Sequence, residues 1–308
     1  MQFSVIICSH NPRMDYLARV LQALKEQDLS RSEWELLLID NASRIPLTGT
    51  CDLSWHPHAR CVEETEVGLT SARLRGIGEA QGEILVFVDD DNVLERDYLV
   101  ECARISEKCP YLGAWGGQEF HEFEGGEPEE QWKRDFWMPP KLQREIWSNN
   151  YDRTAAPAGA GMCVRRIVAR QYADLAAADP VRSKLGRKGS GLNSSEDIDM
   201  AFTACDMGLG IGRFLSLRLV HLISRRRLTD DYLFRLIESI SYSETMLMAL
   251  RQGIPSKPCR VDRFVDSYKR LRMPKIQRSI ARAVADGRMR ALNDLADSGS
   301  VSDGATTE

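Results

Sequence analysis

The sequence lacks the marks of several protein classes. Its eight cysteines are scattered, with no C-x-x-C pair and no short framework, which predicts reduced thiols rather than disulfides or a zinc site. No run approaches the roughly 18 apolar residues of a membrane span. The N-terminus carries no basic, leader-like segment and enters an apolar run at once. These absences predict a cytoplasmic protein and leave peripheral contact with the inner face of a membrane open.

Common nucleotide-binding motifs and a strong net charge are also missing. Neither G-x-G-x-x-G nor G-x-x-x-x-G-K-[ST] occurs, which argues against the usual dinucleotide and P-loop phosphate sites. A net charge of −4 at pH 7 gives no general case for a nucleic-acid partner. The composition, 43% apolar and 28% charged, is that of a globular chain. Its 308 residues suffice for one large α/β core or two smaller ones.

Strand-length apolar runs alternate with helical patterns in the first third of the chain. The strands are expected at 3–8, 34–40, 60–65 and 83–88. Apolar residues spaced i, i+3, i+4, i+7 predict a helix at 17–24, with Asn11 as its N-cap and Pro12 in its first turn, and another at 69–80. Such alternation predicts an α/β fold with a mostly parallel sheet and helices on both faces.

Polar side chains follow three of these strands. Ser9, Asp40 and Asp89 each stand at a strand end, and ligands of such sheets bind at the carboxyl ends of the strands. Asp89 opens a run of three acids, Asp89-Asp90-Asp91. Two carboxylates one residue apart face the same way and suit a hard cation such as Mn²⁺ or Mg²⁺. The alternative is a solvated turn whose acids cap the following helix.

The order of the motifs is itself informative. VIICSHNP, LLIDNAS, EVGLTSARLRGI and ILVFVDDDN occur in sequence, and GAGMCVRR, SSEDIDMAF and RLVHLI follow them. This set resembles family 2 glycosyltransferases, which have the GT-A fold, over about residues 3–230. The resemblance implies a nucleotide diphospho-sugar donor, for which a UDP-sugar is the first expectation, together with Mn²⁺ or Mg²⁺. It also implies transfer with inversion to a saccharide or lipid-linked acceptor in polysaccharide, glycan or glycolipid biosynthesis.

The resemblance implies donor-side roles at the sheet edge. Asp91 would bind the metal. Asp89 would contact the ribose or sugar and share in the metal site, and Asp90 would join the nucleotide site. Asp40 would accept the N3–H of a uracil-type base, unless its carboxylate only closes a turn in the DNAS segment. The remaining donor-side candidates are Ser9 and Asn11 beside the base and Arg73 on the base or diphosphate.

The catalytic candidate lies in the segment 194–208, where apolar spacing predicts a helix. Asp197 would be the base that takes a proton from the acceptor hydroxyl, as the resemblance implies, with Glu196 as its substitute or as a hydrogen-bond partner of the acceptor. The alternative is structural, because Ser194-x-x-Asp197 is close to a capping box and acids favour any first helical turn.

Later residues are assigned to the diphosphate and the acceptor. His221 would add to the metal or diphosphate site, although a lone histidine is often structural. The arginines 225–227 (Arg225, Arg226, Arg227) would close over the diphosphate, face anionic lipid or simply be solvated. The acidic stretch 116–140 has little periodicity, and its Trp132 and Trp137 would stack on the acceptor sugar or pin the stretch to the core. The resemblance implies that the floor of the sugar site lies at Gly159, Ala160, Gly161 and Met162.

The domain organisation follows from these assignments. We expect a catalytic domain at 1–222, a nucleotide-binding half at about 1–118, an acceptor-binding half at about 119–222, a helical extension at 223–297 and a disordered tail at 298–308. A basic, partly amphipathic helix at 278–297 suits either packing or an anionic membrane surface. Two rivals stay open, a nucleotidyltransferase that makes nucleotide sugars and a non-catalytic nucleotide-sugar-binding protein. The sequence does not indicate the donor sugar, the linkage or the oligomeric state.

Overall fold

The structure is a computed structural model that describes residues 1–138, 140–257, 259 and 267–302. The chain divides into two compact units. The first comprises residues 1–183 and 196–228, and the second comprises 184–195 and 229–308. The candidate site residues proposed from the sequence all belong to the first unit.

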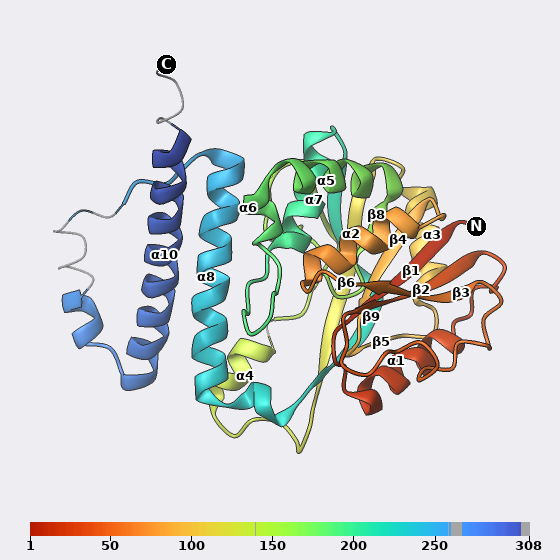
Figure 1. The fold of residues 1–308 in the computed structure, drawn as a ribbon. Coiled ribbons are helices and arrows are strands. Elements are labelled where there is room, and N and C mark those ends of the chain that lie inside the picture. The colour runs from red at the N-terminus through yellow and green to blue at the C-terminus, as the bar shows by residue number, and fades with distance from the viewer. Residues whose placement is uncertain (139, 258, 260–266, 303–308) are drawn as a thin grey trace. The chain divides into compact units, whose positions relative to one another are not determined.

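The N-terminal half of the first unit is a parallel sheet. Its strands are β1 (Phe3–Ser9), β2 (Trp34–Asn41), β3 (Ala59–Glu64) and β4 (Ile84–Asp89), in the order β3-β2-β1-β4. Every residue of β1 and β2 is buried, because helices cover both faces of these strands. Figure 1 shows α1 (Met14–Lys25) and α2 (Leu69–Glu79) on opposite sides of them.

Alternate residues of β1 face these two layers. Phe3, Val5 and Ile7 share a buried cluster with the α1 residues Leu17, Val20 and Leu24. Ile6 points the other way, and a Cβ added to Gly76 of α2 would lie 2.5 Å from its Cγ2. The start of α1 differs from the prediction. The helix begins at Met14 with Arg13 at its N-cap, and Asn11 instead adopts a left-handed φ of 50°, which asparagine tolerates in turns.

The rest of the sheet is mixed. The additional strands are β5 (Asn92–Leu94), β6 (Leu112–Phe123), β7 (Ile146–Ser148), β8 (Cys163–Arg165) and β9 (Gly210–Ile223). β8 runs antiparallel to β4 and β6, and β9 runs parallel to β6 but antiparallel to β5 and β7. The expected parallel arrangement therefore describes one half of the sheet only. The helices of this half are α3 (Tyr98–Lys108), α4 (Gln131–Trp137), α5 (Arg166–Ala178), α6 (Pro180–Ser183), α7 (Glu196–Asp206) and the 3₁₀ turn η1 (Arg225–Leu228).

The stretch expected to lack periodicity is largely regular. Residues 118–123 continue β6 and pair with 218–223 of β9, so Glu119, His121 and Phe123 share one face. The helix α4 follows them. The sequence signal is weak because glutamate, present at positions 119 and 122, is depleted in strands, and pairing with a neighbouring strand overrides that preference.

The second unit contains two long helices, α8 (Asp230–Gln252) and α10 (Lys275–Ser302). Thr229 caps α8 by accepting a hydrogen bond from the backbone N–H of Tyr232. The helices approach closely at Gly287, where a Cβ would lie 2.1 Å from the carbonyl oxygen of Glu238. The predicted basic helix is thus present. The predicted disordered tail overlaps α10 as far as Ser302, and residues 303–308 lie outside the described residues. Within the described ranges, no helix has both the length and the apolar character to cross a bilayer.

Candidate active site

The sheet register brings the ends of three strands to one edge. Ser9 lies opposite Asp40, and Cys8 lies opposite Asp89. Asp91 follows directly, before the short strand β5. The three acids therefore do not cap a helix, because the element that follows them is a strand and α3 begins only at Tyr98.

Each acid of the 89–91 run has a partner in the protein. Ser9 Oγ donates to Asp90 Oδ2 at 2.6 Å. Burial, reinforced by the neighbouring Asp91 carboxylate, raises the pKa of Asp90 to about 7. Arg73 Nη2 lies 3.4 Å from Asp89 Oδ1, and Arg227 Nη2 lies 2.9 Å from Asp91 Oδ2. Two guanidinium groups thus offset the negative charge at the edge.

The turn itself is held by Asn92, which is fully buried. Its Oδ1 accepts from the backbone N–H of Asp89 at 3.2 Å, and its Nδ2 donates to Asp91 Oδ1 at 3.1 Å. Asn92 therefore aims the Asp91 carboxylate.

His221 lies beside Asp91 because β9 pairs with β5. Asn92 and His221 are register partners, and His221 Nε2 lies 3.5 Å from Asp91 Oδ2. On its other side, His221 Nδ1 lies 3.4 Å from Glu119 Oε2. Burial disfavours a charge on His221, but the carboxylates of Asp91 and Glu119 outweigh it and raise its pKa to about 9.

Glu119 and His121 of β6 were not expected in the site. His121 is the register partner of His221, and its Nε2 lies 3.9 Å from Glu119 Oε2. Burial lowers the pKa of His121 to about 4, so its ring is neutral near pH 7. Trp137 of α4 packs against both imidazoles, at ring distances of 6.0 and 6.3 Å. Only the alternation of Glu119 and His121 along the stretch could have indicated them.

Two groups of side chains could bind a cation. Asp91 Oδ2 and His221 Nε2, at 3.5 Å, have the spacing of two ligands of one ion with bonds of about 2.0–2.2 Å. Arg227 now binds these same two atoms, since its Nη1 lies 2.9 Å from His221 Nε2. The second group is Glu119, His121 and His221, whose ligand atoms lie within 4.8 Å of one another.

The E-D pair begins α7. Glu196 is buried and forms an ion pair with Arg73 at 2.8 Å. Asp197 is only half-buried, and its Oδ2 accepts a hydrogen bond from the backbone N–H of Gly159 at 2.7 Å. The two acids are therefore distinct, since one carboxylate neutralises a buried arginine and the other reaches the surface of the site.

The segment 159–162 lies close against these residues. A Cβ on Gly159 would lie 2.6 Å from Arg73 Nη2 and 3.1 Å from Asp197 Oδ2. Gly161 has a φ of 70°, and its carbonyl accepts from Tyr98 Oη at 2.6 Å. Ala160 is half-buried, whereas Met162 is fully buried and belongs to the core.

Asp40 and Asn11 hold the loop that follows β2. The Asp40 carboxylate accepts from the backbone N–H groups of Ser43 and Leu47 at 3.0 and 2.8 Å. Asn11 Oδ1 accepts from the backbone N–H of Arg44 at 2.9 Å. The turn chemistry weighed for Asp40 is therefore present, and each carboxylate oxygen retains a further lone pair for a ligand.

The remaining candidates occupy different environments. Trp137 is 8% exposed and packs inside the site, whereas Trp132 is half-buried, with the Lys133 ammonium 5.6 Å from its ring centre. Among the three arginines, Arg227 reaches Asp91, while Arg225 and Arg226 are exposed in η1.

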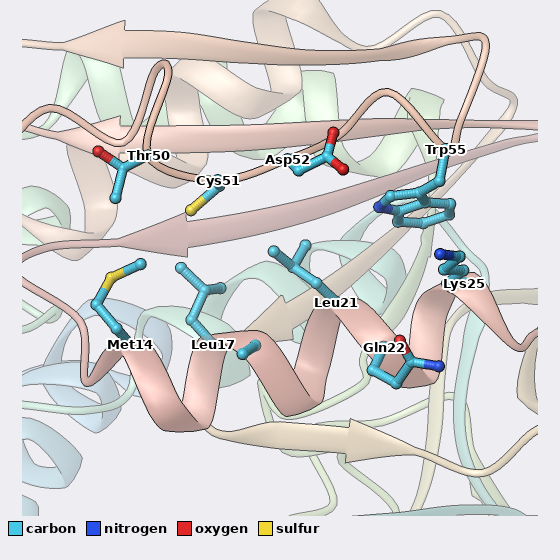
Figure 2. Close-up of a pocket in the computed structure, with 10 residues that line it drawn as sticks. Met14, Leu17, Leu21, Gln22, Lys25, Thr50, Cys51, Asp52 and Trp55 are labelled. Atoms are coloured by element: carbon cyan, nitrogen blue, oxygen red, sulfur yellow. The ribbon is translucent and has the colours of Figure 1, made fainter.

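A cavity of about 270 Å³ lies elsewhere, between α1 and residues 50–55. Figure 2 shows Met14, Leu17 and Leu21 of α1 pointing toward Cys51 and Trp55 across it. None of the residues predicted for the site lines this cavity. The cavity is therefore distinct from the site at the sheet edge.

The family of the chain is shown by its match to one protein-family model. The model described as Glycosyl transferase family 2 matches residues 4–172. The poly(ribitol-phosphate) beta-N-acetylglucosaminyltransferase TarS of Staphylococcus aureus is 26% identical over 106 residues, which are 33% of this chain and 18% of TarS. The chain therefore matches less than a fifth of the length of this curated relative.

Solved structures show a similar fold. The crystal structure of S. aureus TarS superposes with a TM-score of 0.54 at 15% identity, over 95% of this chain and 55% of TarS. The mannosyltransferase PcManGT from Pyrobaculum calidifontis, solved with GDP-Man and Mn²⁺, has a TM-score of 0.56 at 18% identity, over 97% of this chain and 80% of its own. At these identities the likeness is one of fold.

Proposed function

Because this chain belongs to glycosyl transferase family 2, we propose that it transfers a sugar from a nucleotide diphospho-sugar to an acceptor hydroxyl with inversion. The observation that carries the proposal is the position of Arg73. Its guanidinium contacts Asp89 at the donor edge and Glu196 beside the candidate base. One buried arginine thus joins the acids expected to bind the donor to the turn expected to activate the acceptor.

The donor side is proposed at the ends of β1, β2 and β4. Asp40 would face the base through the free lone pairs of its carboxylate, with Ser9 and Asn11 beside it. We propose a UDP-sugar, in line with the N-acetylglucosaminyltransferase activity in the name of TarS. PcManGT was solved with a guanine nucleotide sugar, so the donor screen below includes both bases.

A divalent cation, Mn²⁺ or Mg²⁺, would be held by Asp91 and His221, with Asp89 nearby. The 3.5 Å separation of Asp91 Oδ2 and His221 Nε2 supports this position. When bound, such a cation neutralises charge that builds on a departing diphosphate. Arg227 and the cation would compete for the same two atoms. We therefore propose that Arg227 turns to the diphosphate when the cation binds, with Arg225 and Arg226 on the exposed side of the same turn.

Asp197 is proposed as the general base. Asp197 is half-buried, and the hydrogen bond from the backbone N–H of Gly159 orients its Oδ2. An oriented carboxylate that reaches the surface of the site can accept a proton from a bound hydroxyl. The acceptor oxygen forms a bond to the anomeric carbon, the bond from that carbon to the diphosphate breaks, and the hydroxyl proton passes to Asp197. Glu196 is less suited, because its carboxylate is buried and already paired with Arg73.

The acceptor side is proposed along Gly159, Ala160 and Gly161, where the absence of large side chains lets a sugar approach the backbone. Trp132 is half-buried and would be available for stacking on a sugar, whereas Trp137 is positioned to support the histidines. The acceptor is proposed to be a saccharide or a lipid-linked sugar of polysaccharide, glycan or glycolipid biosynthesis.

The location proposed is the cytoplasm, with peripheral contact at a membrane. The cysteines are free thiols, which supports a reducing compartment. In the second unit, residues 267–282 carry six basic side chains and no acidic one, and Tyr268 and Leu271 are exposed. Cations with exposed apolar side chains suit an anionic membrane surface. Sedimentation with phosphatidylglycerol vesicles, but not with phosphatidylcholine vesicles, would test this.

The test of the proposed function is a donor screen by thermal shift, with UDP- and GDP-sugars in the presence and absence of Mn²⁺. We expect stabilisation by a nucleotide sugar that depends on the cation, followed by release of nucleoside diphosphate when an acceptor is added. Release of pyrophosphate from a nucleoside triphosphate and a sugar phosphate would instead identify a nucleotidyltransferase. Tight donor binding without transfer or slow hydrolysis would identify a binding protein.

A further inference from the structure

The imidazole of His221 lies between two carboxylates. Its Nδ1 is 3.4 Å from Glu119 Oε2, and its Nε2 is 3.5 Å from Asp91 Oδ2. A neutral imidazole carries one proton, and the nitrogen without the proton is the one that can bind a cation. The partner on each side of the ring therefore decides whether His221 can present the lone pair of Nε2 to a cation that Asp91 also binds.

The contact with Arg227 indicates which nitrogen is free. A guanidinium group has donors only, and Arg227 Nη1 lies 2.9 Å from His221 Nε2. In the neutral ring that cation binding requires, this contact is compatible only with Nε2 as the acceptor, and the proton of the ring is then on Nδ1. That proton points at Glu119, and the lone pair of Nε2 points at the side where Asp91 lies.

Neighbouring groups hold this arrangement. Glu119 is two residues before His121, the register partner of His221, so its side chain emerges on the same face of the sheet. His121 flanks the Glu119 carboxylate at 3.9 Å. Trp137 packs edge-on against His221 at an interplanar angle of 89°, and a bulky neighbour of this kind limits rotation of the imidazole.

We infer that Glu119 is a positioning residue, which fixes the His221 tautomer and thereby presents Nε2 to the cation shared with Asp91. The inference rests on the proposed function, because it assigns a role to Glu119 at the same cation site. Histidines that bind metals commonly donate their other N–H to a carboxylate, and loss of that carboxylate typically costs about 10- to 100-fold in metal affinity.

The alternative is that Glu119, His121 and His221 themselves surround the ion. Their ligand atoms lie within 4.8 Å of one another, whereas adjacent ligands of an octahedral ion lie roughly 3.0 Å apart when each bond is about 2.1 Å long. The pair Asp91 and His221 needs less adjustment. Mn²⁺ and Mg²⁺ also favour oxygen ligands over a set rich in imidazole.

The test measures Mn²⁺ affinity in the presence of UDP, by electron paramagnetic resonance, for E119L and E119Q. Leucine removes the acceptor for the Nδ1 proton, and we expect a loss of affinity of about 10- to 100-fold. Glutamine keeps an acceptor oxygen and should lose no more than a few-fold. E122Q is the matched control, since Glu122 lies on the same strand, faces the other way and pairs with Arg19; its affinity should equal that of the wild type.

Three outcomes separate this inference from the proposed function. If D91N and H221N retain Mn²⁺, the proposed cation site is wrong, whatever Glu119 does. If those two lose Mn²⁺ while E119L retains it, the role of Glu119 is overturned. If H121Q loses as much affinity as H221N, the ion is held by the three-residue group, and the positioning role is likewise overturned.

One further measurement does not depend on the folding of E119L. In the wild type with Mg²⁺ and UDP, ¹⁵N nuclear magnetic resonance of the histidine side chains, assigned with H221N, should show a proton on Nδ1 of His221. A proton on Nε2 instead would contradict the inference.

Discussion

The guanidinium of Arg73 donates a hydrogen bond to Glu196 Oε1 at 2.8 Å, and both side chains are only 3% exposed. The pair joins α2 to the first turn of α7 across 123 residues of sequence. A buried ion pair is poorly solvated, so each charge depends on the other. The pair therefore ties the stability of the first unit to the position of the adjacent Asp197.

Removal of the Glu196 carboxylate should destabilise the protein. E196L would leave Arg73 buried without its closest anion, which costs about 3–5 kcal/mol in the free energy of unfolding. Urea denaturation would measure this. D197N serves as the comparison, because Asp197 is half-buried, and we expect it to change the unfolding free energy by less than about 1 kcal/mol. Equal losses in the two variants would argue against the separate roles.

The same D197N variant should greatly slow the transfer reaction. Loss of a general base lowers the turnover rate by about 10²- to 10⁴-fold, while the donor should bind within a few-fold of the wild type. Turnover and donor affinity would be measured separately, by product formation and by calorimetry. Transfer near the wild-type rate would show that Asp197 is not the base.

Asp91 should govern cation-dependent donor binding. D91A removes one of the two atoms proposed to bind the cation, so calorimetry with UDP should lose the part of the affinity that requires Mn²⁺. D52N, a change to an exposed acid in the loop beside the cavity of Figure 2, should leave that affinity unaltered. Full retention of Mn²⁺-dependent binding by D91A would contradict the cation site.

A single methyl group at Gly159 should disturb the site. In G159A the new Cβ would lie 2.6 Å from Arg73 Nη2, and overpacking of this kind costs about 1–3 kcal/mol. Asp197 would shift as well, so we expect a lower turnover rate. G78A is the control, because Gly78 lies in α2 with open space around it. Alanine should stabilise that helix by about 0.5–1 kcal/mol and leave turnover unchanged.

His56 should make the stability of the first unit depend on pH. Its ring packs against Trp34 at 4.1 Å, and its Nδ1 accepts from the backbone N–H of His58 at 3.1 Å. Burial lowers the pKa of His56 to about 4, against about 6.5 in an unfolded chain. The unfolded state therefore takes up a proton first as the pH falls.

The sign follows from this difference. The stability contributed by neutral His56 is present above about pH 6.5 and is lost as the pH falls from about 6.5 to about 4, by at most about 3 kcal/mol. Denaturation at several pH values should show that slope, and H56Q should flatten it. H58Q is the control, because it keeps the backbone N–H that donates to His56 and removes only a cause of the lowered pKa that is smaller than burial, so most of the slope should remain. An identical slope in H56Q and the wild type would refute the assignment.

Much of the architecture could be predicted from the sequence. The α/β GT-A fold and the family are confirmed. Both could be predicted because each buried strand is a local apolar run and each strand end carries its own motif. The predicted start of α1 was wrong. Pro12 is compatible with a first helical turn, but the Asn11 side chain binds the loop after β2, and the helix begins only at Met14. The full-length β6 was missed because strand pairing, not residue preference, forms it.

The candidate site divides in the same way. The sequence alone determined which segments stand at the carboxyl edge of the sheet, because chain order and strand period specify where Ser9, Asp40 and Asp89 emerge. Only the tertiary structure decided what meets there. Arg227 on Asp91, Glu196 on Arg73 and Glu119 on His221 are contacts between residues far apart in the chain, and such partners depend on how strands and helices pack in space, which no local pattern encodes.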